Sequence, residues 1–256
     1  MTTLSNMLIP DGHRPVAFLL GLLVSVLVSG AALAFQLVPI IQDFEPSGRG
    51  ANQTFQVEND RDEPVTVTIA MAVRKVDIDG KETNEATEDF TVFPTEVLLQ
   101  PKSSRLVRVK WVGDPAPKGE LAYRIIAEET PLNMRRTTPG ASLFLTIRYV
   151  GSVYVVPKSV RPDVVVASAQ PIVSPRGTRM LEVVLENRGQ RHGVLDAPQM
   201  TVTAGGTSRT LNGSAVAETL AGENILAQSR RRFVLPLPAD LPEGPIKAEL
   251  KYSLLQ

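Results

Sequence analysis

The side chains able to do chemistry are few in this 256-residue sequence, and their spacing excludes most kinds of catalytic or metal site. Cysteine is absent, which rules out thiol catalysis, disulfides and metal sites built on thiolates. The two histidines are His13 and His192, and the sequence contains neither a zinc-binding H-E-x-x-H motif nor a G-x-S-x-G nucleophile elbow. We therefore interpret His192 as an ordinary loop residue.

Two acidic patterns resemble functional motifs, and both have a simpler interpretation. Residues 77–80 (DIDG) resemble the start of a calcium loop, but the later ligands and the terminal glutamate do not follow in register, so this segment is predicted to be a turn. Glu128 and Glu129 are adjacent, and adjacent strand residues face opposite ways. We predict a protein that is not an enzyme and has no metal, cofactor or small-molecule substrate.

The composition is that of a folded chain without a strong electrostatic field. Hydrophobic residues make up 43% and charged residues 21%, which is enough apolar material to bury a core. The 27 Lys and Arg residues balance the 27 Asp and Glu residues, so nothing in the net charge favours nucleic acid as a partner.

The N-terminal sequence has the features of an export signal. Arg14 precedes an apolar run over residues 15–34, which ends in Ala32-Leu33-Ala34, the small-residue spacing that signal peptidase accepts. We predict that residues 1–34 are a signal peptide cleaved after Ala34, which places the mature protein in the periplasm. The alternative is an uncleaved anchor, because ~20 apolar residues can span a bilayer.

From residue 35 onward, short alternating segments and turn residues predict an all-β protein. Strands are expected at residues 50–58, 65–76, 90–93, 104–112, 121–128, 164–169, 180–186, 199–204, 207–211, 231–237 and 247–254. Pro157 and Pro162 interrupt the pattern and favour a boundary between two domains, residues 35–157 and 158–256. The strand number and spacing are typical of two immunoglobulin-like sandwiches. We interpret the arginine run at residues 230–232 as a solvated face rather than a binding patch.

The segment at residues 141–157 (ASLFLTIRYVGSVYVVP) is the longest predicted strand. Its first half alternates, with Leu143, Leu145, Ile147 and Tyr149 on one face. It is about three times the usual strand length of ~5 to 6 residues. Such a strand either bridges two sheets or offers part of itself to a partner, and an ordinary sandwich strand is the alternative.

Several segments together resemble the periplasmic chaperones of the chaperone–usher pathway of pilus assembly. They are residues 54–69 (TFQVENDRDEPVTVTI), 90–109 (FTVFPTEVLLQPKSSRLVRV), 121–131 (LAYRIIAEETP), 152–157 (SVYVVP) and 183–195 (VVLENRGQRHGVL). No single motif is diagnostic, but their order and spacing cover nearly the whole mature chain. The resemblance implies two immunoglobulin-like domains joined at an angle, and a chaperone that delivers pilin subunits to an outer-membrane usher.

The resemblance also implies how the subunit is held. The long strand would be lent to a pilin that lacks its last strand, with Leu143, Leu145 and Ile147 at the donor positions. The alternative is a structural envelope or surface protein, such as a pilin-like or adhesin-like subunit. Such a subunit should carry its own N-terminal donor segment, and residues 35–41 (FQLVPII) are too short and contain Pro39.

The sequence departs from the family it resembles at the cations that usually bind the subunit's terminal carboxylate, and it therefore resembles a divergent, archaic-type member. Ser152 stands where a lysine is expected, and Asp43 lies near the expected arginine. Since a desolvated carboxylate still needs a cation, a replacement is expected on a neighbouring strand. The candidates are Arg124, then Arg108 and Arg148, with Arg74 and Arg209 as control positions.

Overall fold

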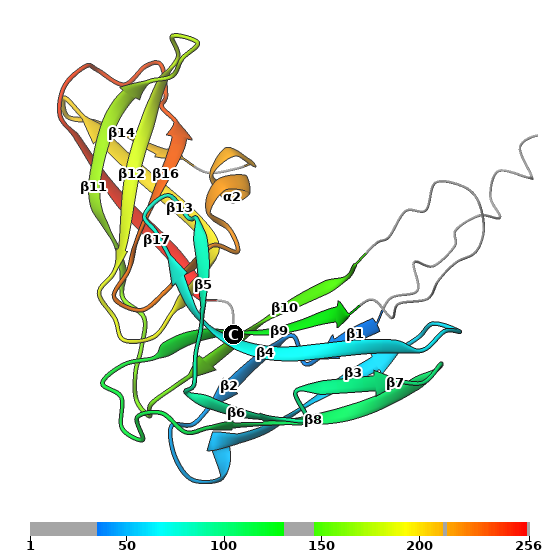
Figure 1. Cartoon of the computed structure of the whole chain (residues 1–256). Helices are drawn as coiled ribbons and strands as arrows, with labels where there is room; N and C mark the ends of the chain where they lie inside the picture. The colour runs from blue at the N-terminus through cyan, green and yellow to red at the C-terminus, as the bar shows by residue number, and fades with distance from the viewer. Residues whose placement is uncertain (1–34, 131–145, 212–213, 255–256) are drawn as a thin grey trace, which may run out of the picture. The chain divides into compact units, whose positions relative to one another are not determined.

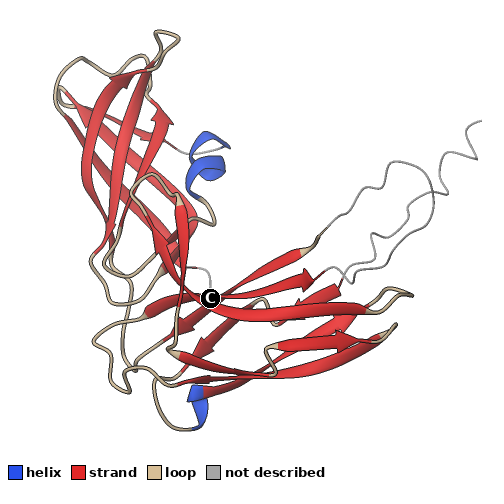
Figure 2. Ribbon diagram, viewed as in Figure 1, coloured by secondary structure: helices blue, strands red, loops and turns tan. Residues whose placement is uncertain are grey.

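We describe the protein from a computed structural model, which covers residues 35–130, 146–211 and 214–254. Strands dominate the described chain (Figure 2), as the alternating pattern predicts. The helical pieces in this part are the 3-10 helix η1 (Arg49–Ala51) and the helix α2 (Ser214–Leu220). No helix in the described ranges is long and apolar enough to cross a bilayer. The predicted signal peptide lies outside the described residues.

The first domain is a sandwich of two sheets (Figure 1). One sheet has the order β1-β3-β8-β6, formed by β1 (Phe35–Val38), β3 (Asn52–Asn59), β8 (Ser103–Trp111) and β6 (Phe90–Phe93). The other has the order β2-β10-β9-β4-β5, formed by β2 (Ile41–Phe44), β10 (Arg148–Val155), β9 (Leu121–Thr130), β4 (Val65–Val76) and β5 (Glu82–Ala86). A further strand, β7 (Glu96–Leu99), pairs with β4.

Alternate side chains of both sheets fill the core between them, because successive strand residues point to opposite faces. Phe55 and Val107 from one sheet and Ile125 and Val153 from the other are fully buried. Each such side chain stabilises the fold by roughly 1.5–3 kcal/mol relative to exposure. The regular alternation therefore decides which face of β9 and β10 points away from the core.

Two sequence segments change from one sheet to the other at a proline. Between β1 and β2 the Val38–Pro39 bond is cis, and between β6 and β7 the Phe93–Pro94 bond is cis. Proline has no N–H to give to a strand ladder, so pairing is interrupted at these points. As a result, β1 pairs antiparallel with β3, whereas β2 pairs in parallel with β10.

The second domain is also a two-sheet sandwich. One sheet has the order β11-β12-β16, formed by β11 (Val164–Val173), β12 (Arg179–Asn187) and β16 (Arg230–Pro236). The other contains β14 (Thr207–Leu211), β13 (Gly193–Ala204) and β15 (Asn224–Ile225), with β17 (Ile246–Leu254) paired to β13. Gly205 and Gly206 form the hairpin turn between β13 and β14, and both have positive φ, as such a tight turn requires.

A buried asparagine closes a turn in each domain. Asn59 ends β3 and donates to the carbonyls of Glu63 and Gln100, at 2.9 and 3.1 Å. Asn187 ends β12 and donates to the carbonyls of Arg191 and Ile225, at 2.7 and 3.0 Å. Both side chains are almost fully buried, and burying an amide is tolerable only when it is hydrogen-bonded in this way.

Candidate functional site

The other described strands cover β10 only partly on one of its sides. It pairs antiparallel with β9 from Arg148 to Val155, and Figure 1 shows these two strands side by side. On its other side, β2 pairs with β10 only from Ser152 onward, where Ser152 lies opposite Ile41. Within the described part of the chain, residues 148–150 therefore have β9 as their one strand neighbour. We call residues 148–150 the open edge of β10.

Gly151 marks the point where the covering strand begins. A Cβ at this position would lie 2.8 Å from Ile125 Cγ2 and 3.0 Å from the Ile40 carbonyl oxygen. A side chain would therefore push the incoming chain away from β10. Glycine lets the Ser152 amide donate to the Ile40 carbonyl at 2.8 Å, which starts the parallel ladder.

The predicted donor residues fall at the limit of the described chain. Leu143 and Leu145 lie outside the described residues. Ile147 is half-buried and packs with Tyr149 against the core of its own domain, while Arg148 and Val150 are exposed on the opposite face. The predicted alternation is thus confirmed over residues 147–150. The donor role of the three residues stays a prediction.

Arg124 lies directly beside Ser152. The two residues are opposite each other in the β9–β10 pair, and Arg124 Nη1 donates to Ser152 Oγ at 2.5 Å. The remaining guanidinium bonds go to Glu82, with Nε at 2.7 Å from Oε1 and Nη2 at 2.6 Å from Oε2. Arg124 therefore places a cation next to Ser152, the position where the resemblance to the chaperones predicts a lysine.

Glu82 is shared between two arginines. Arg74 Nε donates to Glu82 Oε2 at 2.9 Å, and Arg74 Nη1 donates to the Tyr154 hydroxyl at 3.0 Å. The side chains of Arg74, Arg124 and Glu82 are 11%, 15% and 24% exposed, so water screens them only partly. The hydrogen bond from Arg124, helped by the charge of Arg74, lowers the pKa of Glu82 to about 2. We call these three residues the guanidinium cluster.

This arrangement corrects the choice of Arg74 as a control position. Arg74 follows Ala72, the partner of Arg124 in the β4–β9 pair, by two residues, so both arginines project from the same face of the sheet. Since they share one carboxylate, a substitution at either is expected to change the other. Arg209, which pairs with Asp240 at 2.7 Å in the second domain, remains a suitable control.

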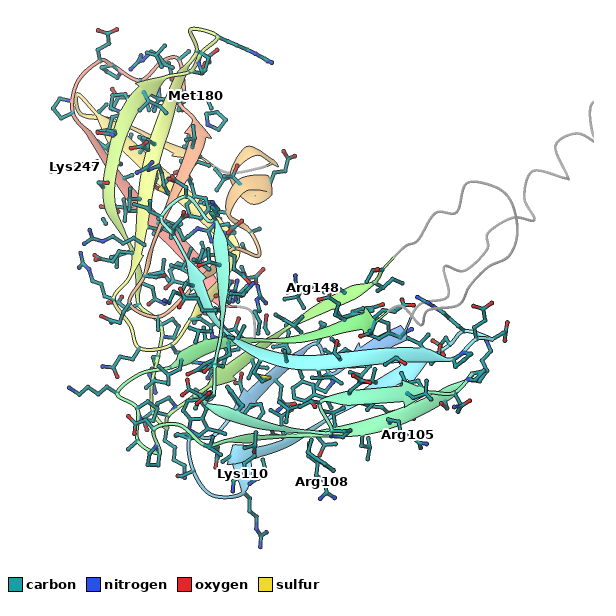
Figure 3. All side chains as sticks on the ribbon, viewed as in Figure 1. Arg105, Arg108, Lys110, Arg148, Met180 and Lys247 are labelled. Atoms are coloured by element: carbon teal, nitrogen blue, oxygen red, sulfur yellow. The ribbon has the colours of Figure 1, made fainter. Side chains whose placement is uncertain are left out.

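The other two candidate arginines lie elsewhere. Arg148 is on the open edge, half exposed, and 3.5 Å from Glu128. Arg108 is on β8, in the sheet that does not contain β10, and its exposed side chain points away from the sandwich (Figure 3). Only Arg124 among the three candidates contacts the residue at the expected lysine position.

His192 is bound more closely than the ordinary loop residue that the sequence predicts. Its Nδ1 lies 2.8 Å from both carboxylate oxygens of Glu120, whose side chain is 1% exposed. Its ring stacks on Tyr154 with centroids 4.1 Å apart. The Tyr154 hydroxyl accepts from Asn224 at 2.8 Å as well as from Arg74. These contacts join the second domain to the guanidinium cluster.

Asp43 and the acidic residues of the two motif-like patterns have structural partners. Asp43 pairs with Arg191 at 3.0 Å. Glu128 and Glu129 face opposite ways, as predicted, with Glu129 held by two bonds from Arg61. The predicted turn at residues 77–80 is confirmed, since the Asp77 carboxylate accepts from the Asp79 and Lys81 amides. In the described ranges, no group of three acidic or histidine side chains could hold a metal.

The lowered pKa of Glu82 predicts a pH-dependent contribution to stability. Its ordinary value is 4.5 and its folded value is about 2, so its contribution is fully present above 4.5 and is lost as the pH falls toward 2. Glu82→Gln should therefore lower the free energy of unfolding at neutral pH and have little effect near pH 2. Urea titrations of both proteins at the two pH values test this, and an equal difference at both would contradict it.

Comparison with known proteins identifies the first domain. Residues 46–161 match the family model of the pili and flagellar-assembly chaperones, PapD N-terminal domain. The match covers most of the first domain. The family is one of chaperones rather than enzymes. No curated protein sequence matches the chain significantly.

Solved fimbrial chaperones share the fold of this chain over both domains. The class 5 fimbriae chaperone CfaA has a TM-score of 0.52 at 15% identity, covering 86% of this chain and 100% of its own. The chaperone–tip adhesin complex of CFA/I fimbriae gives 0.54 at 14% identity, covering 85% and 98%. The CsuC–CsuE pre-assembly complex of archaic Csu pili from Acinetobacter baumannii gives 0.52 at 15% identity, covering 78% and 89%. The chain therefore has the two-domain immunoglobulin-like fold of fimbrial chaperones.

Proposed function

We propose that the protein is a periplasmic chaperone that binds fimbrial subunits by donor-strand complementation and delivers them to an outer-membrane usher. The observation that carries this proposal is the open edge of β10. The strand N–H and C=O groups on an uncovered side are a template for pairing with another chain. The open edge leads back into residues 141–147, where Leu143, Leu145 and Ile147 alternate on one face. Each of these side chains, if buried in a subunit, would contribute roughly 1.5–3 kcal/mol before ordering costs.

The beginning of β2 supports a fixed register for the bound subunit. A subunit strand that runs parallel to β10 along the open edge must end at Ser152, because β2 occupies the side of β10 from there onward. Arg124 donates a hydrogen bond to Ser152, the residue at which the subunit strand would end. A guanidinium binds a carboxylate with two parallel bonds, so Arg124 is suited to hold a subunit's terminal carboxylate there.

The partner class follows from the related complexes. CsuC is bound to a tip adhesion subunit before assembly, and the CFA/I complex also joins a chaperone to a tip adhesin. By this similarity, we expect the partner to be a pilin or tip subunit, with the usher of the same pathway as the acceptor. Neither partner is a nucleic acid, in keeping with the balanced charge of the chain.

The alternative function, a structural subunit of the envelope or surface, fits the first domain less well. A polymerising subunit needs a free N-terminal segment to donate to its neighbour. Here β1 and β2 both pair within their own sandwich, with β3 and β10 respectively. These ten residues, 35–44, are therefore used in the fold of the first domain.

Isolation of the tagged protein from the periplasm of its own host tests the proposal. Native mass spectrometry should find it in a one-to-one complex with a small fimbrial subunit. A ladder of self-polymers would support the structural subunit instead, and an isolated monomer under conditions of fimbrial expression would contradict both functions.

A further inference from the structure

The guanidinium cluster already contains a carboxylate. Glu82 receives two parallel bonds from Arg124, at 2.7 and 2.6 Å, and one from Arg74 at 2.9 Å. This fork is the geometry with which an arginine binds any carboxylate, including a chain terminus. In the isolated protein, the proposed anchor is therefore occupied by a side chain of the same chain.

The charge of the cluster is not balanced by Glu82 alone. Arg74 and Arg124 bring two positive charges, and Glu82 is the acidic residue that pairs with them in the described chain. One positive charge is left over in a group of side chains that are each less than a quarter exposed. A second carboxylate would neutralise the cluster, whereas a neutral chain end would not.

Glu82 is held in position independently of the two arginines. It lies on β5, opposite Val76 in the β4–β5 pair. The turn between these strands is fixed to the second domain, because the Arg232 amide donates to the Ile78 carbonyl at 2.7 Å and the Arg232 guanidinium pairs with Asp79 at 3.0 Å. The strand should therefore keep its position when the Glu82 charge is removed.

We propose that Glu82 is an internal competitor for the subunit's terminal carboxylate at Arg124, and that Arg74 holds Glu82 when the subunit displaces it from Arg124. This inference rests on the proposed function. When a subunit binds, its carboxylate takes over bonds of Arg124, and Glu82 keeps its bond to Arg74. Because Glu82 competes for Arg124, the subunit is bound less tightly, which favours its later release. The cluster also prefers a charged chain terminus, because a neutral one cannot replace Glu82 at Arg124.

Binding of two synthetic peptides to the purified protein tests this inference. Both peptides have the same sequence of alternating valine and threonine, but one ends in a free carboxylate and the other in an amide. Glu82→Gln should bind the acid peptide about tenfold more tightly than the wild type does, since the arginines lose their resident partner. The amide peptide should bind both proteins equally.

The matched control is Glu85→Gln. Glu85 is on the same strand and pairs with Lys75 at 2.7 Å, but it is exposed and three residues away, on the opposite face of β5. This variant should bind the acid peptide as the wild type does. If Glu82→Gln does not bind the acid peptide more tightly than the wild type and Glu85→Gln do, the inference is wrong.

The same titrations separate this inference from the proposed function. If the wild type prefers the acid peptide and Arg124→Ala loses that preference, the anchor role of Arg124 holds whatever Glu82→Gln does. If the wild type and Arg124→Ala both bind the two peptides equally, the anchor itself is wrong, and with it any competition by Glu82.

Discussion

Leu145→Arg is expected to abolish subunit capture while leaving the protein folded. The sequence alternation places Leu145 in the middle of the three predicted donor residues. A charge buried in the apolar groove of a subunit costs several kcal/mol, whereas the same charge on a free strand in water costs little. The yield of subunit that co-purifies with the tagged protein should fall at least about a hundredfold, since ~1.4 kcal/mol corresponds to a factor of ten. Circular dichroism should stay unchanged.

The control for this variant is Thr146→Arg, one residue along the chain. Thr146 is exposed and belongs to the opposite face of the alternation. Subunit yield with this variant should remain close to that of the wild type. Equal losses from the two substitutions would mean that the face assigned to the donor residues is wrong.

Arg124→Ala is expected to cause the second-largest loss of subunit binding. The substitution removes the guanidinium beside Ser152 and leaves a subunit carboxylate without its main partner at the end of the open edge. Breaking one side of a partly buried, hydrogen-bonded charge pair costs about 2–5 kcal/mol, which corresponds to a loss of about thirtyfold or more in affinity. Isothermal titration with the co-purified subunit measures this change.

Two further variants define what the loss means. Arg124→Lys should recover only part of the affinity, because an ammonium cannot make two parallel bonds to a carboxylate. Arg209→Ala removes an arginine with a single carboxylate partner, Asp240, in the second domain and should leave the affinity unchanged. If Arg124→Ala binds as tightly as Arg209→Ala, strand pairing alone holds the subunit.

Most of the strands could be predicted because they alternate and end at turn residues. Residues 65–76, 90–93 and 207–211 have the predicted bounds of β4, β6 and β14. The strands that were missed are short or polar. β5 has the sequence ETNEA, which has no apolar face, and it forms because the tight turn at Gly80 returns the chain along β4. β1 and β2 were missed because Pro39 interrupts the alternation between two short strands that belong to different sheets.

The site could be predicted in part. The departure at Ser152 led to Arg124 because neighbouring strands pair residue by residue, and the structure has these two residues opposite each other. Glu82 could not be found in this way, since its strand was not expected. The arginine run is only partly solvated, because Arg231 is packed over Phe233 and bonded to Glu223. Contacts between the two domains leave no periodic pattern in the sequence of either domain, so they could not be predicted.

Hydrogen–deuterium exchange on residues 141–150, with and without bound subunit, tests the central proposal most directly. If the protein lends this strand, the backbone amides there must enter a ladder with the subunit and exchange more slowly in the complex. We expect strong protection of residues 141–150 on binding and no change in β17 (Ile246–Leu254), a strand of the second domain. A stable complex in which residues 141–150 exchange as fast as in the free protein would contradict the proposal.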